Sequence, residues 1–209
     1  MTRRIISPDT KEAPLTGSAN NAVFFTIGHS TRSLVDFLAL LRDANVTFVV
    51  DVRTVPRSRT NPQYDRVTLA QELASQKIGY EHIAELGGLR GKQRDVSTNA
   101  NAFWQNKSFH NYADYAASES FRCGLARLRE LGHRHTSAIM CAETLWWRCH
   151  RRIITDYLLA AHERVFHIVG PGQVTPAVVT YAAKPDGSGT LVYPAEGAIS
   201  SSGATLVRW

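Results

Sequence analysis

The stretch from Thr136 to Val169, TSAIMCAETLWWRCHRRIITDYLLAAHERVFHIV, decides the fold because its hydrophobic pattern changes twice. Residues 136–141 form a short, mostly apolar run of strand length, and residues 164–169 form another. Residues 144–162 lie between them and carry apolar side chains at helical spacing. Alternation of short buried strands with amphipathic helices is typical of α/β proteins whose strands are mostly parallel.

The same alternation precedes this stretch. Ser33 and Asp36 form an S-x-x-D capping box, which predicts the start of a helix. Further strands are expected at 23–27, 46–50 and 80–83, and further helices at 34–41, 68–77 and 112–131. The sequence therefore predicts a three-layer α/β fold with a mostly parallel central sheet flanked by helices.

Length and composition favour one domain. The chain has 209 residues, of which 44% are hydrophobic, and this is enough to bury the core of one sizeable domain. We expect a flexible N-terminal tail at 1–21, a single α/β domain at 22–193 and a C-terminal tail at 194–209. Residues 87–108 form a long polar and glycine-bearing stretch that we expect to move, because few of its side chains can anchor to a core.

Charge and cysteine content limit the partners. The formal net charge of +6 and a pI near 9.5 favour an anionic small molecule, such as a nucleotide or phosphate ester, or a nucleic acid. Three cysteines, an odd number, indicate free thiols in a reducing compartment. No apolar run approaches the roughly 20 residues that a bilayer requires, and the N-terminus has no hydrophobic signal core. We therefore expect a cytoplasmic protein without a membrane partner.

Ionisable or nucleophilic residues follow three of the predicted strands. The triplets are Gly28-His29-Ser30, Asp51-Val52-Arg53 and Cys141-Ala142-Glu143. In open parallel sheets, ligands bind beyond the carboxyl ends of the strands, where loops and helix N-termini converge. We therefore expect the three triplets to meet at one site.

Two of these residues could act as nucleophile or acid/base. Cys141 is placed between a strand end and a predicted helix N-terminus, a position that stabilises a thiolate and can also hold an anion. The alternative is a small, buried and inert cysteine. His29 is either a general acid/base with a pKa near 6.5 or a histidine that is hydrogen-bonded to backbone in a turn.

Each of the charged residues at the strand ends also has two possible roles. Arg53 and Arg57 could clamp a phosphate or carboxylate, or could form surface ion pairs with Asp51 or Asp65. Asp51 is either an orienting carboxylate or a catalytic base. Glu143 is either a general base or a favourable charge in the first turn of the helix predicted at 144–162.

Cys149, His150 and Arg151 fall inside that predicted helix. Helical spacing places Cys149 toward the core, whereas His150 and Arg151 could reach back toward the strand ends. A metal site would combine Cys141, Cys149 and His150 with His29 or Glu143. Because the chain has no compact C-x-x-C pair and no H-x-x-x-H helix pair, we predict no metal and no cofactor.

The stretch LGGLRGKQRD, which contains Gly87 and Gly88, could cradle a phosphate, but its spacing matches neither the P-loop nor the dinucleotide fingerprint. The aromatic residues that follow it either stack on nucleobases or anchor the loop to the core. They are Phe103, Trp104, Phe109, Tyr112 and Tyr115.

Taken together in order, the motifs TIGHS, VVDVRTVPRSR, YEHIAELGG, IMCAETLWWRCHRR and VFHI resemble the domain-of-unknown-function family 488. The resemblance spans about residues 24–168, and the chain shows no departure from these motifs. It implies a small α/β protein whose motif residues gather at one site, without naming an activity. Carried onto this chain, those residues are Gly28, His29, Ser30, Asp51, Arg53, Pro56, Ser58, Leu86, Gly87, Gly88, Cys141, Glu143, Cys149, His150 and Arg151.

The leading hypothesis is an enzyme that acts on a phosphate-bearing substrate, a nucleotide or nucleic acid. Cys141 or His29 would act as nucleophile or acid/base, and Asp51 and Glu143 would orient groups or carry protons. The groups expected to bind the anion or substrate are Arg53, Arg57, Ser30, Ser58, Gly87, Gly88, His150 and Arg151. One alternative is a non-catalytic module that binds nucleic acid; a second is a thiol- or metal-dependent protein.

Overall fold

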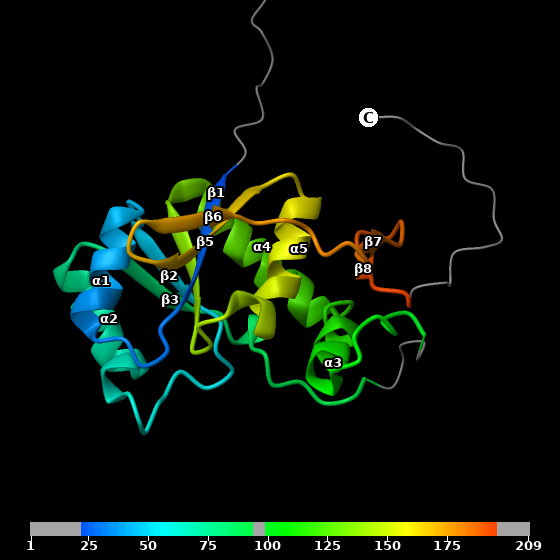
Figure 1. Cartoon of the computed structure of the whole chain (residues 1–209), viewed down its shortest axis with the longest axis horizontal. Coiled ribbons are helices and arrows are strands. Elements are labelled where there is room, and N and C mark those ends of the chain that lie inside the picture. Colours follow the sequence, from blue (N-terminus) through cyan, green and yellow to red (C-terminus); the bar gives the residue numbers. More distant parts are fainter. Residues whose placement is uncertain (1–21, 94–98, 196–209) are drawn as a thin grey trace, which may run out of the picture.

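A computed structural model describes residues 22–93 and 99–195. The N-terminal tail predicted at 1–21 and all but the first two residues of the tail predicted at 194–209 lie outside the described residues. A six-stranded sheet forms the centre of the molecule, in the order β3-β2-β4-β1-β5-β6 (Figure 1). The strands are β1 Val23–Gly28, β2 Phe48–Asp51, β3 Gly79–His82, β4 Ser137–Cys141, β5 Arg164–Gly170 and β6 Gln173–Pro176.

Five of these strands are parallel, and only β6 runs antiparallel to its neighbour β5. Five α-helices occur in the described chain: α1 Leu34–Asp43, α2 Arg66–Ser75, α3 Lys107–Tyr115, α4 Glu119–Arg134 and α5 Arg151–Ala160. Helices α1 and α2 lie on one side of the sheet, and α4 and α5 lie on the other (Figure 1). The predicted three-layer α/β fold is confirmed.

Each face of the sheet has its own core. On one face, Phe37 and Leu41 of α1 and Leu69 of α2 pack against strand residues such as Val49 and Ile27. On the other face, residues of α3, α4 and α5 pack against the opposite sides of the same strands. The central strands are apolar on both faces for this reason, which explains their continuous hydrophobic runs.

Local signals placed most elements correctly. Ser33 caps α1 as its S-x-x-D pattern predicts, because its Oγ accepts a hydrogen bond from the Asp36 backbone N–H at 3.1 Å. The segment expected to hold one or two helices at 112–131 contains two, and Ser118 caps the second.

A small two-stranded sheet, β7 Lys184–Pro185 and β8 Leu191–Val192, follows β6. Within the described ranges, no helix is both long and apolar enough to cross a membrane.

One element differs from its prediction. The helix expected at 144–162 begins only at Arg151, and the chain between β4 and α5 is a loop whose only helical part is a three-residue 3-10 turn, Trp146–Arg148. The Arg151 guanidinium donates hydrogen bonds to the carbonyl oxygens of Glu143 and Thr144. Those carbonyls would otherwise accept the first bonds of a helix, so a tertiary contact overrides the helical spacing of the sequence.

Candidate functional site

The carboxyl ends of β1, β2 and β4 meet as predicted. The His29 N–H donates to the Cys141 carbonyl at 2.9 Å, and the Val52 N–H donates to the Met140 carbonyl at 3.0 Å. A pocket of about 580 Å³ opens beside these ends. Of the residues predicted for the site, its walls include His29, Ser30, Arg53, Arg57, Ser58, Gly88, Cys141, Glu143 and His150.

Three predicted residues lie outside the pocket lining: Asp51, Gly87 and Arg151. Asp51 and Arg151 are buried behind it, with at most 1% of their surface exposed. Two further lining residues matter for charge and chemistry: sequence reasoning missed Arg148, and it included Cys149 only in the metal alternative and through the family resemblance. Arg148 had no distinguishing pattern, and Cys149 was assigned to the core side of a helix that does not extend that far.

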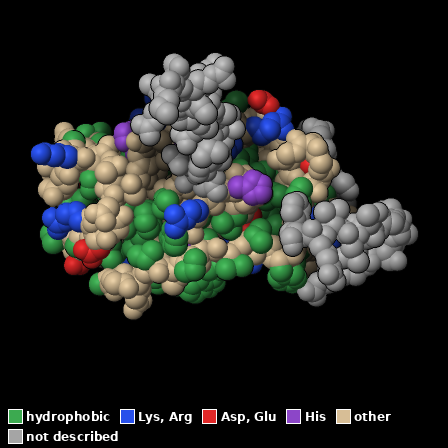
Figure 2. All heavy atoms as spheres, turned by 90° about the horizontal axis from the view of Figure 1, so that it is seen from above, with side chains coloured by type: hydrophobic (Ala, Val, Ile, Leu, Met, Phe, Trp, Pro, Cys, Tyr) green, Lys and Arg blue, Asp and Glu red, His purple; other side chains and the backbone are tan. Residues whose placement is uncertain are grey.

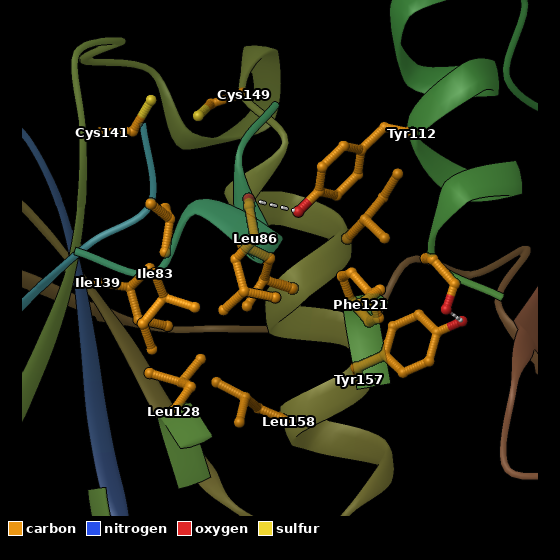
Figure 3. Close-up of a cluster of buried hydrophobic side chains, with 14 of the residues drawn as sticks. Ile83, Leu86, Tyr112, Phe121, Leu128, Ile139, Cys141, Cys149, Tyr157 and Leu158 are labelled. Atoms are coloured by element: carbon orange, nitrogen blue, oxygen red, sulfur yellow. Dashed lines mark hydrogen bonds between the residues drawn. The ribbon is translucent and has the colours of Figure 1, made fainter. Parts of the chain in front are cut away.

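Two cysteines and a histidine form a cluster in the pocket wall, which we call the sulfur–imidazole cluster: Cys141, Cys149 and His150. The two sulfurs and one imidazole nitrogen all lie within 4.8 Å of one another. Figure 3 shows the two cysteines at one end of the buried apolar cluster that also contains Leu86 and Tyr112. Cys141 comes from the end of β4, and Cys149 from the last residues before α5.

The orientation of His150 is fixed on two sides. Its Nε2 lies 2.9 Å from the Val52 carbonyl oxygen, which can only accept, so Nε2 carries a proton. Its Nδ1 faces the Cys149 sulfur at 3.5 Å. Gly88 packs against the imidazole so closely that a Cβ there would lie 2.4 Å from Nδ1. Gly88 therefore positions a ring, whereas the sequence suggested a role in binding the ligand.

Arg151 gives the cluster a buried positive charge. It is 1% exposed and donates from Nε to the Cys149 sulfur at 3.3 Å. In the described part of the chain no carboxylate pairs with it, and its side chain donates instead to the Cys149 sulfur and to two backbone carbonyls. Burial alone would raise the pKa of Cys149, but a hydrogen bond from Cys141 and the charges of His150 and Arg151 hold that pKa well below its ordinary value.

Cys141 holds its proton more tightly than Cys149 does. Its hydrogen bond to Cys149, together with burial, raises the pKa of Cys141 well above the ordinary value. The helix N-terminus predicted directly after Cys141 is absent there, because α5 begins ten residues later at Arg151. The helix end that could favour a thiolate thus lies next to Cys149.

Asp51 and Arg53 form a buried ion pair. The Arg53 Nε and Nη2 donate to the Asp51 carboxylate, with the shortest contact at 2.6 Å, and Nη2 also donates to the Tyr64 carbonyl at 2.8 Å. The Tyr80 hydroxyl donates to the same carboxylate at 2.7 Å. Asp51 is therefore an orienting group for Arg53, and most of the guanidinium is already engaged within the protein.

His29 is held as a neutral imidazole. Its Nδ1–H donates to the Ser30 carbonyl at 2.9 Å, a contact that the left-handed backbone of Ser30 (φ 49°) allows. Its ring stacks on Tyr64 at 4.1 Å, and its Nε2 lies 3.4 Å from Arg53. Burial lowers the pKa of His29 to about 4. The geometry is that of the turn-bonded alternative, and the value near 6.5 expected for a general acid/base is not retained.

Two guanidinium groups remain available at the pocket wall. Arg57 and Arg148 are exposed, and no hydrogen bond or ion pair joins either side chain to another described residue. Asp65, a predicted partner of Arg57, accepts instead from the Ser58 N–H at 2.7 Å. Glu143, also exposed, accepts from the Leu145 N–H at 3.1 Å; it lies in the loop before α5 and so is not in the first turn of that helix.

The predicted stacking aromatics lie mostly in the core. Trp104, Tyr112 and Tyr115 are each at least 93% buried, and the Tyr112 hydroxyl donates to the Leu86 carbonyl at 2.8 Å (Figure 3). Gly87 packs on Thr54, where a Cβ would lie 2.8 Å from the backbone. Among this group, Phe109 and Tyr112 contribute to the pocket wall.

The fold and site define an α/β protein with a sulfur–imidazole cluster at the carboxyl ends of its strands. The model of the family described as "Domain of unknown function DUF488" matches residues 33–158. This covers more than half of the chain, so the protein belongs to that family, as its motifs predict. Searches of curated proteins and of solved structures found no match.

Proposed function

We propose that the protein is an enzyme that acts on a small phosphate-bearing substrate in this pocket. The observation that carries the proposal is the position of Arg57 and Arg148, whose guanidinium groups have no partner among the described residues and line the same pocket as the sulfur–imidazole cluster. The two arginines bind the anion, and the cluster is the reaction centre.

Charge balance in the pocket favours an anion. The pocket wall contains the positive side chains of Arg57 and Arg148 and, among the described residues, only one carboxylate, that of Glu143. The buried charge of Arg151 lies behind the same wall. Guanidinium groups bind phosphate through paired N–H donors, and exposed arginines without an internal partner retain all of these donors. Arg53 adds little because Asp51 already holds it.

Size and lining limit the substrate further. A volume of about 580 Å³ lies within the range of roughly 300–1,000 Å³ that is usual for small-molecule sites. Val55, Leu89, Phe109 and Tyr112 form an apolar part of the wall. A molecule with one phosphate group and an apolar or aromatic remainder, such as a nucleotide or an aryl phosphate, matches both parts of this surface.

The binding-module alternative receives less support. It requires basic residues and exposed aromatic rings arranged along a strand of nucleic acid. On the face seen in Figure 2, the visible Lys and Arg side chains stand apart from one another. The buried rings of Trp104 and Tyr115 are unavailable for stacking on bases. The available arginines adjoin a pocket and a reactive group, and this favours an enzyme.

A calorimetric titration with inorganic phosphate tests the anion site. We expect one phosphate to bind per chain, and expect the double variant Arg57→Ala, Arg148→Ala to lose at least about tenfold in affinity, since each charged hydrogen bond contributes on the order of 1.5–3 kcal/mol. The matched control, Arg42→Ala with Arg134→Ala, removes the same charge from exposed positions outside the pocket. Equal losses in both double variants, or no binding to the wild type, would overturn the proposal.

A further inference from the structure

We propose that Cys141, Cys149 and His150 hold a zinc ion, with one coordination position open to the pocket. The sequence predicts no metal here, and the inference comes from the folded arrangement. It deepens the proposed function by naming the cofactor at the same site, and it therefore rests on that function for its role in the reaction.

One pair of ligand atoms has the spacing that zinc requires, and the third atom lies near that spacing. Tetrahedral zinc has bonds of about 2.3 Å to sulfur and about 2.0–2.1 Å to imidazole nitrogen, which places neighbouring ligand atoms about 3.5–3.8 Å apart. The Cys149 sulfur lies 3.5 Å from the His150 Nδ1, and all three ligand atoms lie within 4.8 Å of one another. Side-chain movements of up to about 1 Å would bring all three atoms to these separations.

The residues that contact the proposed ligand side chains are arranged as they commonly are around metal ions in proteins. A ligating histidine usually donates its other ring N–H to a carbonyl or carboxylate, which fixes the tautomer and the ring orientation. His150 does this through Nε2 to the Val52 carbonyl, so Nδ1 is the nitrogen that faces the sulfurs. Arg151 donates to the Cys149 sulfur, and Gly88 leaves room for the ring.

The charges at this place are compatible with a divalent ion that displaces the proton of Cys141. Cys141 and Cys149 are 8% and 4% exposed, and Arg151 can balance the charge of one buried thiolate. A second thiolate beside the first needs another positive charge, because unpaired buried charge is costly. A divalent ion supplies that charge and allows both sulfurs to act as ligands. Sulfur and imidazole ligands together select zinc over magnesium or calcium.

Three protein ligands leave one position for water or substrate, as in catalytic zinc sites. No fourth His, Cys, Asp or Glu joins the group within the described ranges, and all three ligands line the pocket. In the reaction proposed for this site, a zinc-bound water attacks the phosphorus of a phosphate ester. The bond from phosphorus to the ester oxygen breaks, and that oxygen leaves with the proton that water releases, giving an alcohol and inorganic phosphate.

Elemental analysis of protein purified without chelators or an affinity metal tests the site. We expect one zinc ion per chain in the wild type and strongly reduced zinc in Cys141→Ser, Cys149→Ser and His150→Ala. Cys123→Ser is the matched control, because Cys123 is the exposed cysteine on α4 and lies outside the cluster. A wild type that neither contains zinc nor takes it up from added salt would overturn the proposal, as would retention of zinc by all three variants.

Because a variant could lose zinc by unfolding, a second measurement uses the wild-type chain alone. After removal of metal, cobalt(II) is titrated into the protein, and two thiolate ligands are expected to give an intense sulfur-to-cobalt charge-transfer absorption that saturates at one ion per chain. Absence of this absorption would overturn the proposal. Phosphate binding at Arg57 and Arg148 is measured separately. The zinc proposal can therefore be overturned while the anion-site proposal is supported, and the anion-site proposal can be overturned while the zinc proposal is supported.

Discussion

At the scale of single residues, Arg151 explains most about the site. A fully buried guanidinium usually has a carboxylate partner, and this one has a sulfur and two backbone carbonyls. The same side chain therefore stabilises an anionic Cys149 and fixes the loop before α5. Its position follows from α5, whose first residue it is, so a single helix terminus determines both the local chemistry and the course of the loop.

The buried side chain of His167 is expected to make the free energy of unfolding depend on pH. Burial, with a smaller contribution from the charge of Arg151, lowers the pKa of His167 to about 4, from an ordinary value of 6.5. Between these values the unfolded chain binds a proton that the folded chain does not. Stability due to neutral His167 is therefore complete above about pH 6.5 and is lost as the pH falls toward 4.

Urea denaturation at a series of pH values measures this effect. In the wild type, the free energy of unfolding should fall by about 1–3 kcal/mol more between pH 7 and pH 4 than it does in His167→Gln. The substitution keeps a group that can hydrogen-bond Thr26, which contacts Nδ1 of His167 at 2.8 Å in the wild type. Identical pH profiles for the two proteins would show that His167 is not held neutral.

At the scale of elements, the segment that contains Gly87 and Gly88 positions the imidazole of the cluster. A Cβ at Gly88 would lie 2.4 Å from the His150 Nδ1, so Gly88→Ala should displace the ring. If His150 ligates zinc as proposed, zinc affinity should fall at least about tenfold, since even supporting residues around a metal site commonly contribute that much. Competition with a chromophoric chelator measures the affinity.

Gly91→Ala is the control for this prediction. It lies in the same loop, and a Cβ there would meet nothing within 4 Å. We expect it to bind zinc as the wild type does. A Gly88→Ala protein with wild-type zinc affinity would mean that the ring is not fixed by this contact, or that it is not a ligand.

The sequence predicts the regular elements well where local signals are complete. Ser33 and Asp36 place the start of α1, and the apolar run at 136–141 places β4. Helical spacing fails between Thr144 and His150 because the Glu143 and Thr144 carbonyls accept hydrogen bonds from Arg151, a contact that no local pattern reveals. The error placed Cys149 on the core face of a helix, whereas the family motifs placed it with Cys141 at one site.

At the scale of the whole molecule, the parallel sheet brings distant residues together. The strand order places β4 between β2 and β1, so their carboxyl ends adjoin although they are far apart in sequence. The meeting of the three triplets could be predicted from this general property of parallel sheets. The role of each residue at the site could not be predicted from the sequence. The neutral state of His29, the ion pair of Arg53 with Asp51 and the availability of Arg148 all depend on packing and tertiary contacts.

The central claim is that this pocket is a reaction site for phosphate-bearing molecules. The most direct measurement is release of inorganic phosphate from a panel of nucleotides and aryl phosphates, assayed with and without added zinc. We predict turnover by the wild type and by Cys123→Ser, and a loss of at least about a hundredfold in Cys149→Ser, because removal of a central catalytic group commonly costs this much or more. Turnover by Cys149→Ser at the wild-type rate, or no turnover of any compound by the wild type, would contradict the claim.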